Sequence, residues 1–160
     1  MTDLGTPVRF AVTRTGGWGA WIIRLATRST VNHAYLECDG VIIEAEPGGM
    51  RKTTGTYPGA IYSQPITGDQ ADKAWEWSQD HLEIGYGWLD ILAIVLHLSR
   101  IPTPQWAMNR LMNTGTLICS QAVALAWDAA GLHLGDKAAG LTTPGDLLDV
   151  LQNRPEPADY

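Results

Sequence analysis

Cysteine is scarce in this chain of 160 residues, which contains only Cys38 and Cys119. Two thiols cannot supply a four-thiolate zinc site, an iron–sulfur cluster or the framework of a disulfide-rich domain. The histidines His81, His97 and His133 stand apart and form no His-x-x-x-His pair of the kind that binds metal. We therefore expect no metal site and no other cofactor.

Long apolar runs are also missing. The most apolar stretch, residues 88–98, is interrupted by Asp90, and it is shorter than the roughly 18 apolar residues that span a bilayer. We interpret it as a buried helix and expect no stable membrane insertion. The first residues lack the basic segment and apolar run of a signal peptide, so we expect the protein to be cytoplasmic when it is synthesised.

Basic residues are fewer than acidic ones. The chain has 11 Lys and Arg against 17 Asp and Glu, which gives a net charge of −6. This balance argues against binding to nucleic acid, which depends on neutralising phosphates. A hydrophobic content of 45% is sufficient for a core, and this length suits one domain. We found no repeat or linker, so we expect a single domain over residues 1–160 with a loose tail at 155–160.

The periodicity of apolar residues predicts a mixed α+β fold, with a small antiparallel sheet packed against helices. Alternation at residues 7–13 indicates a strand, and a further short strand is expected at 60–66 after two glycine-containing loops. Helical spacing is found in six segments, namely 18–27, 69–82, 88–99, 105–112, 117–130 and 142–151.

The clearest local signal is a hairpin. Residues 33–38 and 41–46 are two runs rich in strand-forming residues, and only Asp39-Gly40 separates them. Asp-Gly at this position is typical of a type I′ turn, in which both central residues have positive φ.

A two-residue turn places His33 opposite Glu46 and Tyr35 opposite Glu44. Because strand side chains alternate between faces, all four project from one side of the hairpin. A histidine beside a carboxylate can serve as a general base, since the acid orients the ring and stabilises imidazolium. The alternative is a partly exposed sheet face with ordinary polar residues.

Cys119 stands at or just inside the start of the predicted helix 117–130. Free N–H groups and the helix dipole favour a thiolate there, and the same N–H groups can donate to an oxyanion. Cys119 as a small buried hydrophobic residue is the alternative. Cys38 belongs to the other face of the hairpin, and we expect it to be structural.

The order of these motifs resembles that of the circularly permuted NlpC-type papain-like hydrolases, in which the histidine precedes the cysteine. The YiiX-like branch, related to the lecithin retinol acyltransferase group, is the most similar. The resemblance extends over roughly residues 8–150 and is carried by five short motifs, namely Asn32-His33-Ala34-Tyr35, Ile43-Glu44-Ala45, Tyr86, Cys119-Ser120 and Thr143-Pro144-Gly145-Asp146-Leu147.

The resemblance implies that Cys119 is the nucleophile and His33 the base. Glu44 matches the third residue, which orients the histidine, whereas the hairpin pairing favours Glu46 as the acid. We prefer Glu44, because a bulge or a longer turn would shift the pairing.

The same resemblance marks Tyr86 and Ser120 as candidates for oxyanion or substrate contacts. Tyr86 can equally be a core aromatic residue beside a glycine turn.

The resulting hypothesis is a thiol-dependent peptidase or amidase, with a bacterial cell-wall (peptidoglycan) peptide as the leading substrate. A bacterial or bacteriophage origin follows from that substrate, and places the protein in a host cytoplasm or a phage particle. Two alternatives stay open, a non-catalytic papain-like binding or assembly module and a lipid acyltransferase or esterase. Nothing in the sequence specifies an oligomeric state.

Overall fold

A computed structural model describes residues 5–63, 65–87, 96, 104–106, 116–132 and 138–153. The helix predicted at 88–99 and the predicted tail at 155–160 lie outside these residues, apart from the helical residue 96. Of the helix predicted at 105–112, only residues 105 and 106 are described, and both are helical.

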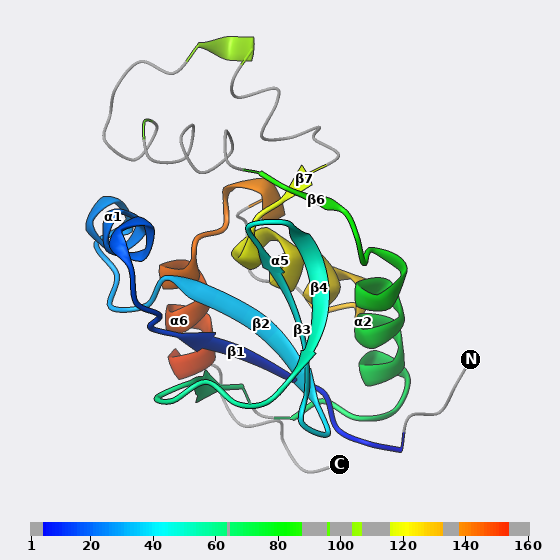
Figure 1. Cartoon of the computed structure of the whole chain (residues 1–160). Helices are drawn as coiled ribbons and strands as arrows, with labels where there is room; N and C mark the ends of the chain where they lie inside the picture. The colour runs from blue at the N-terminus through cyan, green and yellow to red at the C-terminus, as the bar shows by residue number, and fades with distance from the viewer. Residues whose placement is uncertain are drawn as a thin grey trace.

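The chain forms an α+β fold around a five-stranded antiparallel sheet, as predicted (Figure 1). The strand order is β4-β3-β2-β1-β5. The strands are β1 (Arg9–Thr13), β2 (His33–Cys38), β3 (Val41–Glu46), β4 (Gly49–Thr54) and β5 (Ile61–Tyr62). A second, parallel pair consists of β6 (Gly85–Tyr86) and β7 (Thr116–Leu117).

The described helices are α1 (Trp18–Thr27), α2 (Gly68–Asp80), α5 (Cys119–Ala129) and α6 (Pro144–Asn153), with a 3-10 turn at Ala139–Leu141. Helix α5 packs between α2 and α6 and against β2 and β3. In the view of Figure 1, α5 and α6 lie behind the sheet and α2 lies to its right. Helix α1 lies at the edge of the molecule, and none of its residues is buried. Within the described residues, no helix combines the length and the apolar character needed to cross a bilayer.

The hairpin of β2 and β3 forms as its sequence predicts. Asp39 and Gly40 have φ values of 50° and 72°, and Gly40 N–H donates to Glu37 Oε1 at 2.7 Å. Tyr35 pairs with Glu44. The turn therefore has two residues, and no bulge interrupts the paired part of the hairpin.

Two strand predictions need correction. Strand β4 was not predicted, because its residues, Gly-Met-Arg-Lys-Thr-Thr, show little apolar alternation. It pairs with β3 alone, and its second half is largely exposed. Strand β5 is much shorter than the segment 60–66, of which Ile66 forms only an isolated bridge to Val8.

The two faces of the sheet carry different groups of side chains. The helix-covered face holds the main core, in which Phe10 packs against Trp127 with ring centroids 4.4 Å apart. The opposite face holds Tyr35 with a smaller group of residues, partly covered by Tyr57 and Tyr62. The polar side chains of the hairpin belong to this second face.

Candidate active site

Cys119 is the first residue of α5, and only 4% of it is exposed. The helix start is held by Gln121, whose Oε1 accepts a bond from Ile118 N–H at 3.1 Å. The first intrahelical bond runs from Ala122 N–H to Ile118 O, at 3.0 Å. The N–H groups of residues 119–121 therefore have no acceptor within the helix and are available near the sulfur.

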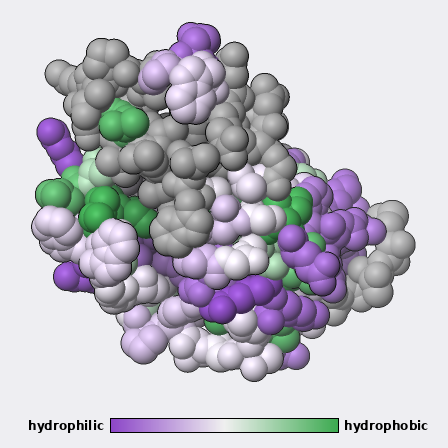
Figure 2. Space-filling view, turned by 45° about the horizontal axis from the view of Figure 1, so that its top comes forward, coloured by the Kyte–Doolittle hydropathy of each residue, from purple (hydrophilic) through white to green (hydrophobic). Residues whose placement is uncertain are grey.

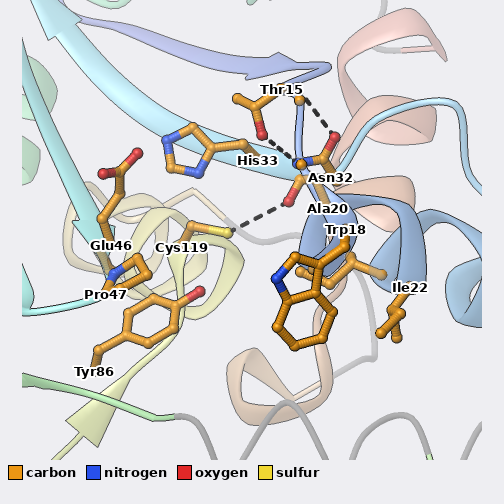
Figure 3. A pocket seen from close by; sticks show the side chains of 15 residues that line it. Thr15, Trp18, Ala20, Ile22, Asn32, His33, Glu46, Pro47, Tyr86 and Cys119 are labelled. Carbon is orange, nitrogen blue, oxygen red and sulfur yellow. Dashed lines mark hydrogen bonds between the residues drawn. The ribbon is translucent and has the colours of Figure 1, made fainter.

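His33 is the first residue of β2, and its ring lies next to Cys119 (Figure 3). Its Nε2 is 2.8 Å from Glu44 Oε2, so Nδ1 is the nitrogen left for the sulfur. Burial lowers the pKa of His33, but hydrogen bonds with Cys119 and Glu44 outweigh it and raise the pKa to about 10. The imidazolium is therefore favoured at neutral pH.

Glu44 is 2% exposed and accepts hydrogen bonds from several side chains. Arg51 donates to Oε1 from Nε at 3.2 Å and from Nη2 at 3.0 Å, and Tyr57 donates to Oε2 at 2.7 Å. Burial alone would raise the pKa of Glu44, but the bonds from His33, Tyr57 and Arg51 lower it to about 2. The carboxylate is thus held ionised beside the imidazole.

Of the two acids that the sequence suggested, Glu44 is the one bonded to His33. Glu46 is bound by Arg51 at 2.5 Å and lies 3.4 Å from the Tyr57 hydroxyl. Our reason for preferring Glu44 was wrong, since the hairpin register is not shifted. His33 reaches Glu44 because the two residues lie on the same face of neighbouring strands. His33 is two residues away from Tyr35, the direct partner of Glu44, and this diagonal distance is within range of long side chains.

A third group of contacts involves the residue before His33. Asn32 O is 3.9 Å from Cys119 Sγ, the contact drawn as a dashed line in Figure 3. The Asn32 side chain accepts from Arg24 Nη1 at 2.7 Å and donates to Thr15 Oγ1 at 2.6 Å. Arg24 also donates to Thr15 O at 2.9 Å, so α1 is tied to the chain beside the sulfur.

Of these side chains, those of Cys119, His33, Asn32 and Thr15 line one pocket of about 520 Å³. Figure 3 shows Cys119 between two walls, with Trp18 and Ile22 of α1 on one side and Pro47 and Tyr86 on the other. Glu46 also lines it. The pocket thus combines an apolar wall with the polar groups around the sulfur.

Tyr86 and Ser120 have different surroundings. The β6–β7 pair places Tyr86 beside the start of α5 and in the pocket. Burial and the negative charge of Cys119 raise the pKa of Tyr86. The Ser120 hydroxyl is fully buried, donates to Thr142 O at 2.6 Å and does not line the pocket. A substrate contact by the Ser120 side chain is therefore not supported, and only its backbone N–H remains a candidate.

Cys38 is almost as buried as Cys119, at 5% exposed, but its side chain belongs to the hydrophobic core. Burial raises the pKa of its thiol. Both cysteines are free. The two thiols therefore differ in surroundings rather than in exposure.

Sequence reasoning missed Arg51 and Tyr57, and gave no separate role to Asn32. The available signal for Arg51 was Pro47-Gly48, a two-residue turn that sets Arg51 opposite Glu44. No comparable signal marks Tyr57, which reaches Glu44 from a loop.

One group of side chains in the described residues has the spacing of a metal site. Ligand atoms of His33, Glu44 and Glu46 lie within 4.8 Å of one another. His33 Nε2 already contacts Glu44, and Arg51 binds both carboxylates. An ion would have to displace these bonds, so the arrangement fits an orienting network better than a metal centre.

No protein-family model matches the chain, and no curated protein matches it. The functional interpretation therefore depends on the geometry of this pocket and on its chemistry.

Proposed function

We propose that the protein is a cysteine hydrolase of the permuted papain-like type, a peptidase or amidase that cleaves an amide bond. The observation that carries the proposal is the position of His33 between Glu44 and Cys119, at the wall of an open pocket. An imidazole with an ionised acid on one nitrogen and a thiol beside the other is the arrangement that nucleophilic thiol catalysis requires.

In the first half of the reaction, His33 starts as the imidazolium, carrying the proton that Cys119 has given up, and the sulfur attacks the substrate carbonyl carbon. A C–S bond forms, and the N–H groups at the start of α5 stabilise the negative oxygen. Tyr86 lines the same space. The C–N bond then breaks, and His33 returns its proton to the leaving amine.

In the second half, water attacks the thioester while His33 accepts a proton from it. The C–S bond breaks and a carboxylic acid leaves, which gives its proton to solvent, while His33 keeps the other proton beside the sulfur. Glu44 keeps its charge throughout and stabilises the imidazolium, while Arg51 and Tyr57 hold the carboxylate in position. No cofactor is needed for any of these steps.

For the substrate, we propose a peptide or related amide, with a bacterial cell-wall peptide first among the candidates. The apolar wall formed by Trp18, Ile22 and Ile23 favours the alternative, an acyl ester or lipid. Hydrolysis of purified peptidoglycan peptides, compared with that of short- and long-chain p-nitrophenyl esters, distinguishes the two substrate classes.

The test of the site itself uses iodoacetamide, which alkylates reactive thiols. Cys38 is a matched control, because its exposed fraction equals that of Cys119 to within a percentage point. We expect rapid alkylation in wild type and Cys38→Ala, none of it in Cys119→Ala, and a rate at least about tenfold lower in His33→Gln. Circular dichroism checks that each variant is folded.

If Cys119 reacts no faster than Cys38 in the folded protein, the proposal of a catalytic thiol is wrong. Rapid alkylation without turnover of any amide or ester would instead favour the alternative of a papain-like binding module.

A further inference from the structure

Helix α1 presents an apolar stripe to solvent. Trp18, Trp21 and Leu25 are 78%, 57% and 63% exposed, and Arg28 follows them at the end of the helix. Positions 18, 21, 25 and 28 fall on one side of an α-helix. We call these four residues the α1 stripe. Apolar residues gather at the left of Figure 2, over the part of the molecule where Figure 1 places α1.

The charge around this helix differs from that of the whole chain. Residues 5–36 contain four arginines, Arg9, Arg14, Arg24 and Arg28, and no acidic residue. Arg24 is turned toward Asn32, whereas Arg14 and Arg28 are exposed. The segment that includes α1 is thus locally cationic in a protein with a net charge of −6, and it bears the exposed Trp18 and Trp21.

We propose that α1 docks on an anionic lipid surface, with the α1 stripe lying in the headgroup region. Tryptophan rings favour the boundary between water and lipid, and amphipathic helices lie in that plane with their apolar side toward the acyl chains. Arg14 and Arg28 meet the phosphates of anionic lipids. The helix has 10 residues, so it rests on the membrane and does not cross it.

The shape and charge of the surface favour lipid over a second copy of the chain. An α-helix of 10 residues is about 15 Å long, and its exposed ridge is small against the 1,200–2,000 Å² that stable protein interfaces bury. Two copies would also bring together two chains of charge −6. An anionic membrane is repelled by that charge overall and attracted by the arginines beside α1, which favours docking through this helix.

The opposite side of α1 contributes to the pocket. Ile22 and Ile23 line it, and so does Trp18, which belongs to both surfaces. The pocket and the proposed docking surface therefore share Trp18. The proposal does not rest on the hydrolase function, since it concerns the outer side of the helix.

Co-sedimentation with lipid vesicles tests the proposal. We expect wild type to bind vesicles of phosphatidylglycerol and phosphatidylcholine, to bind phosphatidylcholine alone weakly, and to be released by salt. The double variant Trp21→Ser/Leu25→Ser should lower the partition coefficient by at least about tenfold. Trp106→Ser is the matched control, because Trp106 is 69% exposed and lies outside α1.

Two charge-reversal variants complete the experiment. Arg28→Glu should lower binding several-fold, whereas Lys52→Glu, at an exposed position on β4, should change it far less. Alkylation of Cys119 at the wild-type rate shows that each variant keeps its fold, and it reports on the thiol separately from docking.

The proposal is overturned if wild type does not sediment with anionic vesicles, or if Trp106→Ser weakens binding as much as the double variant. Light scattering that shows a dimer, dissociated by Trp21→Ser/Leu25→Ser, would also overturn it and would identify the α1 stripe as a self-association surface.

Discussion

The Nε2 atom of His33 lies 2.8 Å from Glu44 Oε2, although the residue directly across the hairpin from Glu44 is Tyr35. The contact is diagonal and joins residues on the same face of neighbouring strands. It leaves Glu46 free to bind Arg51 at the pocket wall. One hairpin therefore supplies an orienting acid and a second carboxylate with a different set of contacts.

Glu44→Gln should slow alkylation of Cys119 by about ten- to a hundredfold, because the neutral amide no longer stabilises the imidazolium. Glu46→Gln is the matched control and should change the rate much less, since Glu44 and not Glu46 is hydrogen-bonded to His33. Second-order rate constants with iodoacetamide measure both effects. Equal losses in the two variants would contradict the assignment of Glu44.

Cys119→Ala should lower the pKa of His33 from its value of about 10 by at least about one unit. Removing the sulfur removes a hydrogen bond and a negative charge that favour imidazolium, while the burial that opposes it remains. An NMR pH titration of the His33 ring protons follows the midpoint in both proteins. An unchanged midpoint would mean that the ring and the sulfur do not interact.

The stability that Glu44 contributes should disappear in acid. Its pKa is about 2 in the folded protein against 4.5 unfolded, so the contribution is fully present above about pH 4.5 and is lost as pH falls toward 2. Between pH 6 and pH 3, the difference in unfolding free energy between wild type and Glu44→Gln should shrink by about 2 kcal/mol. Urea unfolding at the two pH values measures it, and a constant difference would refute the depressed pKa.

Gly49→Ala should be markedly more destabilising than Gly55→Ala. Both glycines have positive φ, at 120° and 136°, so alanine is strained at either position. At Gly49 a Cβ would also lie 2.6 Å from Ile84 O, whereas at Gly55 it would meet nothing within 4 Å. We expect an extra loss of about 2 kcal/mol or more in thermal or urea unfolding of Gly49→Ala. Equal losses would mean that the segment before β6 adjusts to the added methyl group.

Local signals predicted much of the fold. The Asp39-Gly40 turn and the alternation beside it give the bounds of β2 and β3, and helical spacing gives those of α1. Strand β4 could not be found in this way, because an edge strand with one exposed half has no strong apolar alternation. The prediction of β5 was too long, since of the described residues between Ser63 and Ile66 only Ile66 is paired, through an isolated bridge to Val8.

The site was predictable where it depends on the order of residues in the sequence and on the alternation of strand side chains between two faces. The face shared by His33 and Glu44 follows from alternation, and the position of Cys119 follows from the helix start. The bonds from Arg51 and Tyr57 to Glu44 depend on how a second hairpin and a loop fold over the sheet. The apolar wall from α1 depends on tertiary packing, which local periodicity does not describe.

Asn32 and His33 are consecutive residues, and both of them contact the sulfur of Cys119, one through its carbonyl oxygen and the other through its ring. A single planar peptide unit therefore joins the acceptor and the base, so they are displaced together when the chain moves. The position of the thiol relative to both groups therefore depends on one distance, that between the start of α5 and the start of β2. Substitutions in the core between these two elements should thus alter both sulfur contacts in concert, even when they lie far from the pocket.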